Sequence, residues 1–354
     1  MKAALWHKRN DIRIEVVPDP VPGPDEVILK VEYCGICGTD LEEYRHGPIL
    51  IPTGTPNLLT GIAAPIILGH EFIGEVVEVG RDVVKYKVGD RLAPDVLIYC
   101  GECYWCRRHQ VTLCDHLAAL GLSGHGGLAE YCRVPVSMCI AVPPSLDPAC
   151  AALAEPLSVA VRALRKGRLQ LGETVAVFGA GTIGLLCMQV ALSAGASAVY
   201  VIEPDPFRRE LAVRLGAARA IDPGAGDPVE ALRAITCIGA DLVIEASGVP
   251  AVIPQAIEAA RKAGRIVLVG IPTGPSTLNL VSVVGTEKEV IGSLSHVYDE
   301  DFYTSIRMIA DGRVNVEALI SDRISLDDLL PRGLHRLEEH RADTLKILVA
   351  PGAS

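Results

Sequence analysis

The chain contains 354 residues, of which 49% are apolar and 4% aromatic, and its formal net charge is −10 at pH 7. This length and composition are typical of a well-buried globular protein of about two domains and argue against disorder. The negative charge and the lack of a lysine- or arginine-rich run argue against nucleic-acid binding, so we expect small molecules or further copies of the chain as partners.

The N-terminal run MKAALWHKRNDIRIEV is interrupted by charges and has no apolar stretch before a small-residue cleavage motif. No signal peptide is therefore predicted, and we expect the chain in the cytoplasm. In that compartment the eleven cysteines are expected to be reduced thiols, some of them on metal and others as small apolar fillers.

Residues 1–150 are rich in valine, glycine and proline and contain short alternating segments such as Glu26–Glu32 and Ile73–Val79, which predicts a mainly β domain. Two motifs in this domain carry groups that could do chemistry. The run Cys37-Gly38-Thr39-Asp40 places a thiol near a hydroxyl and a carboxylate, and Gly69-His70-Glu71 follows the apolar segment Ile66–Leu68. Taken singly, a cysteine or a histidine is more often a buried structural side chain, so neither motif alone assigns a site.

Four cysteines lie within fifteen residues, in the run CGECYWCRRHQVTLC: Cys100, Cys103, Cys106 and Cys114. Two consecutive C-x2-C steps, followed by a fourth cysteine after seven more residues, suit a tetrahedral zinc ion with Zn–S bonds of about 2.3 Å. The alternatives are buried cysteines or a disulfide cluster, which the missing secretory context disfavours. We predict a closed structural zinc site over residues 100–114.

The segment Thr174–Ile202 has no charged residue and is long enough by count to span a bilayer, but interior glycines divide it into strand, turn, helix and strand, so no membrane span is predicted. Its first strand, Glu173–Phe178, runs directly into a G-x-G-x-x-G pattern and then a helical pattern. In this context the pattern predicts a dinucleotide site, with the pyrophosphate at the helix N-terminus. The candidate cofactor residues in this turn are Gly179, Gly181, Thr182, Ile183 and Gly184.

The next strand, Ala198–Ile202, ends on Glu203, about twenty residues beyond the glycines, where a carboxylate can accept hydrogen bonds from the adenosine ribose. That carboxylate would repel a 2′-phosphate and favours NAD over NADP. Arg208 and Arg209 could instead attract such a phosphate, but we weigh the carboxylate more heavily. Arg208 is kept as a candidate contact on the adenosine side, with a solvated helix face as the alternative.

Further short apolar runs follow at Leu242–Glu245, Arg265–Val269 and Glu289–Ile291, and the helical pattern Ile253–Lys262 separates the first two. Strands that alternate with helices predict a doubly wound parallel sheet with crossover helices.

Five motifs occur in order over essentially the whole chain: CGICGTD, GHE, the four-cysteine run, EPLS and GAGTIG. Together they resemble the zinc-dependent medium-chain alcohol and polyol dehydrogenases. The segments YRHGPILIP, TGIAAPIILGHEF and DFYTSIRMIADGRVNVEALISDRISL are similar to the 2,3-butanediol dehydrogenase branch, which neighbours the sorbitol and threonine dehydrogenases.

The resemblance implies an α/β fold, with a mainly β GroES-like catalytic domain over residues 1–154 and 296–354 and a Rossmann domain over residues 155–295. It also implies two zinc ions per subunit, NAD as cofactor, and a homotetramer or homodimer. The implied catalytic zinc has three ligands and an open fourth position. These ligands would be Cys37, His70 and Glu155, with Glu71 as a neighbour that in some relatives binds the metal or exchanges with Glu155. Asp40 would accept a hydrogen bond from His70 and fix its tautomer.

The implied activity is reversible, NAD-linked oxidation of a secondary alcohol or vicinal diol to the ketone, of the 2,3-butanediol and acetoin type. In the family the hydroxyl at Thr39 passes the proton to the cofactor ribose and on to a histidine, but this chain has Glu42 at the histidine position, and His46 is a poor substitute. A sorbitol-like polyol or threonine dehydrogenase is the alternative enzyme. A non-catalytic NAD-binding protein on the same scaffold is the alternative from another class, while a zinc hydrolase would have no use for the dinucleotide unit.

Overall fold

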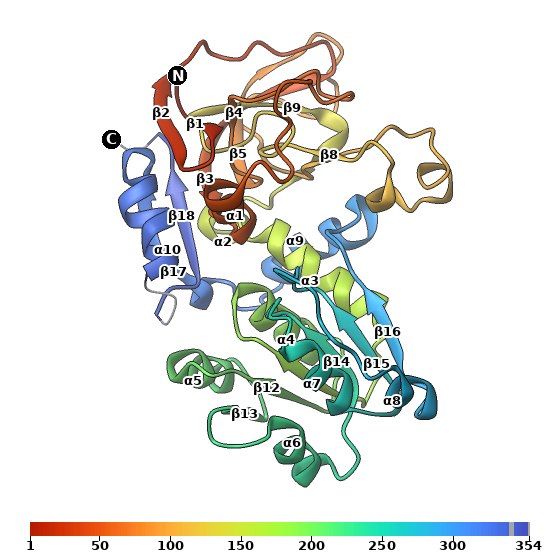
Figure 1. Cartoon of the computed structure of the whole chain (residues 1–354). Helices are drawn as coiled ribbons and strands as arrows, with labels where there is room; N and C mark the ends of the chain where they lie inside the picture. Colours follow the sequence, from red (N-terminus) through yellow and green to blue (C-terminus); the bar gives the residue numbers. More distant parts are fainter. Residues whose placement is uncertain (340–342, 353–354) are drawn as a thin grey trace. The chain divides into compact units, whose positions relative to one another are not determined.

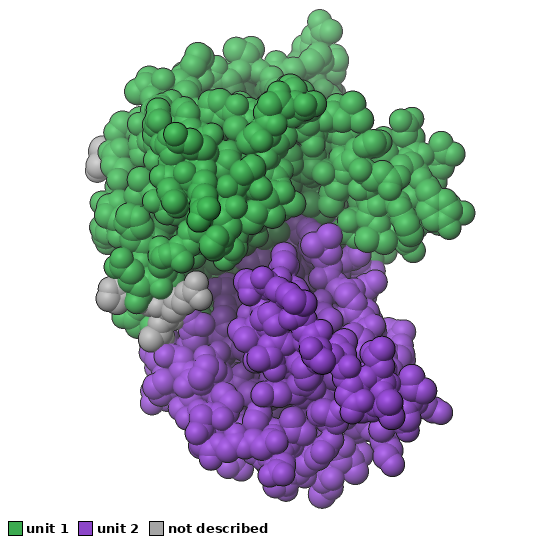
Figure 2. All heavy atoms as spheres, viewed as in Figure 1, with its two compact units in different colours: residues 1–155, 297–310, 316–354 green, residues 156–296, 311–315 purple. Residues whose placement is uncertain are grey.

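The computed structural model describes residues 1–339 and 343–352. The chain forms two compact units, shown in different colours in Figure 2. Unit 1 comprises residues 1–155, 297–310 and 316–354, and unit 2 comprises residues 156–296 and 311–315. Residues 311–315 thus belong to unit 2, although unit 1 residues precede and follow them in sequence. Among the described residues, no helix is long and apolar enough to cross a membrane.

Unit 2 is built on one sheet, which in the described part of the chain has six strands, all parallel (Figure 1). Their order is β13-β12-β11-β14-β15-β16, so the order reverses between β11 and β14, as in doubly wound nucleotide-binding folds. The strands are β11 (Thr174–Phe178), β12 (Ala198–Ile202), β13 (Arg219–Ile221), β14 (Ala240–Glu245), β15 (Ala260–Leu268) and β16 (Glu289–Gly292).

Helices connect these strands, as parallel pairing requires. The connecting helices are α4 (Thr182–Ser193), α5 (Pro206–Arg214), α6 (Pro228–Thr236), α7 (Val252–Ala259) and α8 (Leu280–Gly285), and α3 (Ala154–Lys166) precedes the first strand, β11. The helix predicted over Ile253–Lys262 ends earlier, at Ala259, because Ala260 already pairs with Ala240 in the sheet. Residues 260–262 therefore begin β15 and do not continue the helix.

Unit 1 is mainly β, as its alternating segments predict. Its largest sheet has the order β10-β6-β5-β3-β18-β17, with β9 pairing on β3, and a smaller sheet has the order β2-β1-β4. The strands are β1 (Lys2–Lys8), β2 (Asp11–Val16), β3 (Glu26–Gly35), β4 (Ile66–Ile67), β5 (Glu71–Val79), β6 (Arg91–Pro94), β9 (Tyr131–Pro135), β10 (Cys139–Ala141), β17 (Ile320–Ser325) and β18 (Lys346–Ala350). A two-stranded pair, β7 (Leu97–Ile98) and β8 (Ala118–Ala119), flanks the four-cysteine run. The helices are α1 (Gly38–His46), α2 (Pro148–Ala151), α9 (Tyr303–Ala310) and α10 (His335–Glu339).

The register of the large sheet decides which side chains meet at the end of β3. Gly35 pairs with Glu71 on one side and with Leu348 on the other. Because residues directly opposite one another project to the same face, Glu71 and the even-numbered residues of β18 share a face of the sheet beside Gly35. The apolar core packs around buried side chains such as Trp6, Leu29 and Leu92.

Candidate active site and metal centres

Three candidate ligands converge at the end of β3 and the start of β5. Cys37 is the N-cap residue of α1, and its backbone N–H donates to the carboxylate of Asp40 at 2.9 Å. His70 and Glu71 enter the same region because β5 pairs with β3. One ligand atom each of Cys37, His70 and Glu71 lies within 4.8 Å of the other two. A thiol, an imidazole and a carboxylate at this spacing are a donor set that fits zinc.

The imidazole of His70 faces Asp40. The Nδ1 atom of His70 lies 3.5 Å from Asp40 Oδ1, and both side chains are buried. Burial alone would lower the pKa of His70, but the negative charges of Asp40 and Cys37 outweigh it and raise that pKa well above its ordinary value. With Nδ1 turned toward Asp40, Nε2 is the ring nitrogen available to a metal, which is the arrangement that second-layer carboxylates give to metal-binding histidines.

A buried lysine outside the predicted ligand set contacts the carboxylate of Glu71. The Nζ atom of Lys346 donates to both carboxylate oxygens of Glu71, at 2.6 and 2.8 Å, and to the carbonyl of Ile36 at 3.0 Å. Lys346 is 4% exposed and Glu71 only 1%. A Cβ on Gly35 would collide with the Glu71 carboxylate, so this glycine leaves the space that the ion pair occupies. A single lysine within the apolar run TLKILVA was the available sequence signal.

Glu155 lies in the first turn of α3 and is 9% exposed. It is not part of the group of three ligand atoms, but its charge raises the pKa of Glu71 and of Lys346. Burial is the largest cause of the raised pKa of Glu71, and the charge of Lys346 opposes it. The carboxylates of Glu71 and Glu155 are therefore close enough to interact, and Glu71 is the one that is paired with Lys346.

The residues of the predicted proton relay take different positions. The hydroxyl of Thr39 lies 3.7 Å from the Cys37 thiol, next to the ligand group. The Glu42 side chain is 44% exposed, and its carboxylate lies 3.9 Å from the ring of His46, which is 58% exposed. The structure therefore places Thr39 beside the candidate metal site and Glu42 on a partly solvated face of α1.

The four cysteines of residues 100–114 form the second group of ligand atoms within 4.8 Å. Backbone N–H groups point at their sulfurs, as they do around metal thiolates: those of Cys100, Cys103 and His116 lie 3.4 Å from a cysteine Sγ. Such donors lower the pKa of Cys103 to about 6, whereas burial raises that of Cys106 to about 12. Four thiols at this spacing cannot all ionise without a cation among them, so the donor set fits a closed zinc site.

The glycine-rich turn between β11 and α4 has the shape that the sequence predicts. Gly179 adopts a φ of +93°, and a Cβ on Gly184 would collide with the carbonyl oxygen of Gly179. Gly181 is the N-cap residue of α4 and has no side chain to cap the first turn, which leaves the amides of residues 182–184 to an anion. The Glu203 carboxylate accepts from the N–H of Ala180 at 2.6 Å and of Asp205 at 3.0 Å, so it is held beside this turn.

Arg208 lies in the first turn of α5, where its backbone N–H donates to the N-cap carboxylate of Asp205 at 3.0 Å. Its role as an adenosine contact stays a prediction. Arg209, one residue further, pairs with Asp222.

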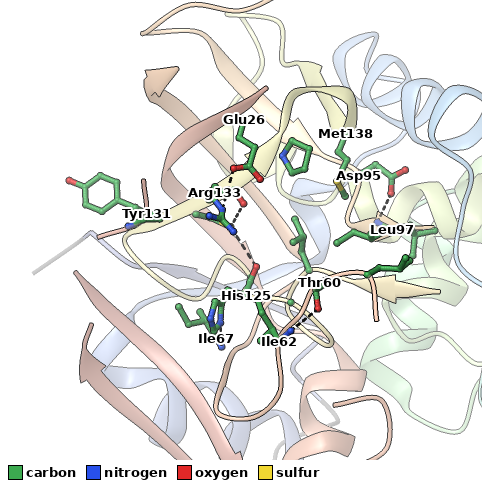
Figure 3. Close-up of a pocket in the computed structure, with 18 of the residues that line it drawn as sticks. Glu26, Thr60, Ile62, Ile67, Asp95, Leu97, His125, Tyr131, Arg133 and Met138 are labelled. Carbon is green, nitrogen blue, oxygen red and sulfur yellow. Dashed lines mark hydrogen bonds and ion pairs between the residues drawn. The ribbon is translucent and has the colours of Figure 1, made fainter. Parts of the chain in front are cut away.

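A separate cavity of about 860 Å³ lies within unit 1, and none of the candidate metal ligands lines it (Figure 3). Its wall includes the ion pair of Arg133 with Glu26, and Figure 3 shows His125 and Thr60 among the other residues that line it. The Nδ1 atom of His125 accepts from the N–H of Ile67 at 3.2 Å. No sequence pattern predicts this cavity.

Two family models match the chain: the alcohol dehydrogenase GroES-like domain over residues 23–144 and the zinc-binding dehydrogenase domain over residues 182–311. The (R,R)-butanediol dehydrogenase of Bacillus subtilis is 39% identical, over 99% of this chain and 100% of the relative. The sorbitol dehydrogenase of the same species is 33% identical, over 99% and 97%.

The chain belongs to the zinc-dependent medium-chain dehydrogenase family. It is an oxidoreductase, and the predicted fold, a GroES-like domain with a Rossmann sheet, is confirmed. The crystal structure of 2R,3R-butanediol dehydrogenase from Bacillus subtilis superposes with a TM-score of 0.93 at 38% identity, over 99% of each chain.

Solved structures of this dehydrogenase fold hold either nicotinamide cofactor. A zinc-binding dehydrogenase of Sinorhizobium meliloti, 33% identical with a TM-score of 0.89, is bound to NADP. An Escherichia coli alcohol dehydrogenase, 30% identical with a TM-score of 0.90, is complexed with NADH. Each comparison covers 99% of both chains. Because the same fold accommodates both cofactors, side chains at the adenosine end must decide between them.

Proposed function

We propose that this dehydrogenase catalyses the reversible, NAD-linked oxidation of a secondary alcohol or vicinal diol to the ketone, with 2,3-butanediol and acetoin as the substrate pair. The observation that carries the proposal is the group of Cys37, His70 and Glu71, whose ligand atoms lie within 4.8 Å of one another. The full-length similarity to a butanediol dehydrogenase supports the choice of substrate.

In this proposal Cys37, His70 and Glu155 would hold the catalytic zinc, and Glu71, which Lys346 keeps in place beside them, would exchange with Glu155 as a ligand. When bound, zinc supplies Lewis acidity, which lowers the pKa of an alcohol and so favours departure of hydride from its carbon. Asp40 orients the His70 ring, and the Thr39 hydroxyl, 3.7 Å from the Cys37 sulfur, accepts the alcohol proton and passes it outward. The first-turn amides of α4 bind the pyrophosphate, and Glu203 binds the adenosine ribose.

A substrate panel tests this function. NAD would be added with the 2,3-butanediol stereoisomers, sorbitol, threonine and simple secondary alcohols, and reduced nicotinamide would be followed by its absorbance. We expect a 2,3-butanediol stereoisomer to give the largest kcat/KM. A preference for sorbitol or threonine would move the chain to the alternative branch, and no signal across the panel with zinc present would favour a non-catalytic NAD-binding role.

We propose further that the chain assembles with copies of itself, as a homodimer or homotetramer. Strand β16 is an edge of the unit 2 sheet, and the adjacent helix α8 exposes Leu280, Val281 and Val284 by 64%, 79% and 78%. An exposed apolar face beside an open sheet edge is a liability for a monomer. Light scattering of a Val281→Glu/Val284→Glu variant is expected to give a smaller mass than the parent chain, and an unchanged mass would exclude this face.

A further inference from the structure

Two acidic residues directly follow neighbouring strands at the carboxyl edge of the unit 2 sheet. The last residues of β12 and β13, Ile202 and Ile221, pair with each other, and the N–H of Glu203 donates to the carbonyl of Ile221 at 3.1 Å. Glu203 and Asp222 therefore leave their strands at the same level. Since ligands of doubly wound sheets bind beyond the carboxyl ends of the strands, both acids lie at the end of the site where the adenosine ribose is proposed to bind.

The guanidinium of Arg209 spans these two strand ends. Its Nη1 donates to the carbonyl oxygens of Glu203 and Pro204, at 2.9 and 2.5 Å, and its Nη2 lies 3.0 Å from the Asp222 carboxylate. The Arg209 side chain is 20% exposed, so these contacts hold it against the loop between β12 and α5. Asp222 is itself fixed, because its Oδ1 accepts from the N–H of Gly224 at 2.8 Å.

This arrangement bears on the choice between NAD and NADP. A bound 2′-phosphate needs a cation whose charge is not already neutralised, and arginine is the side chain best suited to it. Here Arg209, which lies at the proposed adenosine end of the site, is already paired with the carboxylate of Asp222. A phosphate that bound beside Arg209 would also be repelled by the negative charges of Glu203 and Asp222.

We propose that Asp222 is a specificity-determining residue of the cofactor site, because it pairs with Arg209 and so withholds that guanidinium from a 2′-phosphate. This inference rests on the proposed function only in placing a nicotinamide dinucleotide at this sheet edge. In this inference a residue that is neither part of the glycine-rich turn nor the acid at the end of β12, Glu203, contributes to discrimination between NAD and NADP.

The test is an Asp222→Asn variant, which removes the charge and keeps the amide oxygen that accepts from Gly224. Binding of NADPH and NADH would be measured by nicotinamide fluorescence, without an alcohol substrate. We expect the NADPH-to-NADH affinity ratio to rise about tenfold, through tighter NADPH binding, which is the size of one recovered charge-assisted contact. Asp241→Asn is the matched control, because Asp241 pairs with Arg261 at 2.6 Å near the opposite end of the sheet, and its ratio should equal that of the parent.

A double-mutant cycle with Arg209→Gln tests whether the effect of Asp222→Asn acts through Arg209. In the Arg209→Gln background, Asp222→Asn should raise the ratio by clearly less than tenfold, because only the direct repulsion of the phosphate by Asp222 is removed and no guanidinium is released. An unchanged ratio in the single Asp222→Asn variant, or an equal rise without Arg209, would overturn the inference while leaving NAD-linked catalysis intact. A parent chain that binds neither nucleotide would overturn this inference and the proposed function together.

Discussion

The two candidate metal centres of unit 1 are assembled in opposite ways. The closed centre draws its four cysteines from fifteen consecutive residues, whereas the other joins Cys37 with His70 and Glu71, and with a lysine 275 positions from Glu71. A local cluster can be recognised from sequence spacing alone, because ligands that are close in sequence must also lie close in space. A dispersed cluster depends on strand register, which one sequence does not display.

The largest expected effect separates chemistry from stability. Cys37→Ala or His70→Ala should lower kcat/KM on the order of 10³-fold or more, because loss of a metal ligand removes several kcal/mol of transition-state stabilisation. NADH affinity, measured by fluorescence, should stay within about twofold, since the proposed nucleotide site lies on unit 2. Retention of diol oxidation by Cys37→Ala in metal-free buffer would show that the zinc assignment is wrong.

The closed centre should respond in the opposite sense. Cys103→Ala removes one of four ligands from a proposed zinc site whose metal binding would be coupled to folding, so we expect the melting temperature to fall by about 10 °C. Specific activity per folded molecule should change little. Cys237→Ala is the matched control, because Cys237 is an exposed cysteine outside the run and its loss should leave the melting temperature unchanged. Equal effects of the two variants would remove the reason to place a metal at residues 100–114.

The buried ion pair beside the dispersed centre gives the next prediction. Lys346→Met would leave the Glu71 carboxylate buried without its partner, at an expected cost of about 3–5 kcal/mol in the free energy of unfolding. Urea denaturation measures this cost, and Glu71→Gln in the same chain should recover most of it.

Lys288→Met is the control for that measurement. Lys288 is also buried, but its ammonium donates to the carbonyl of Ile257, and the nearest carboxylate, that of Glu258, lies 3.9 Å away. Its loss strands no buried carboxylate, so the penalty should be smaller. If both lysine variants lost the same free energy of unfolding, the ion pair with Glu71 would not be the reason that Lys346 stabilises the fold.

The same contrast explains which features the sequence could predict. Strand Ala198–Ile202, the glycine turn and the four-cysteine run are local patterns, and the first has the predicted bounds. Strand β13 was missed because three residues are too few to show a period. The roles of Cys37, His70 and Glu155 came from a resemblance, and Lys346 remained hidden because its partner is fixed by pairing of β18 with β3 and of β3 with β5.

The smallest expected effect concerns a partly exposed ion pair in unit 2, for comparison with the buried pair of Lys346. Asp241 accepts from Arg261 at 2.6 Å and from the amide and hydroxyl of Thr174, each at 2.8 Å. Burial would raise the pKa of Asp241, but these hydrogen bonds and the charge of Arg261 outweigh it and lower the pKa below 3.8.

Because the pKa of Asp241 is lower in the folded than in the unfolded chain, its contribution to stability is fully present above the unfolded value of about 3.9 and is lost as the pH falls through the folded value. Asp241→Asn should therefore reduce the free energy of unfolding by about 1 kcal/mol at pH 7, the scale of an exposed pair with hydrogen bonds. Unfolding measured from pH 7 to pH 3 should show the difference between parent and variant shrinking below about pH 4. A difference that stays constant with pH would show that packing or hydrogen bonding, and not the carboxylate charge, stabilises this corner of the sheet.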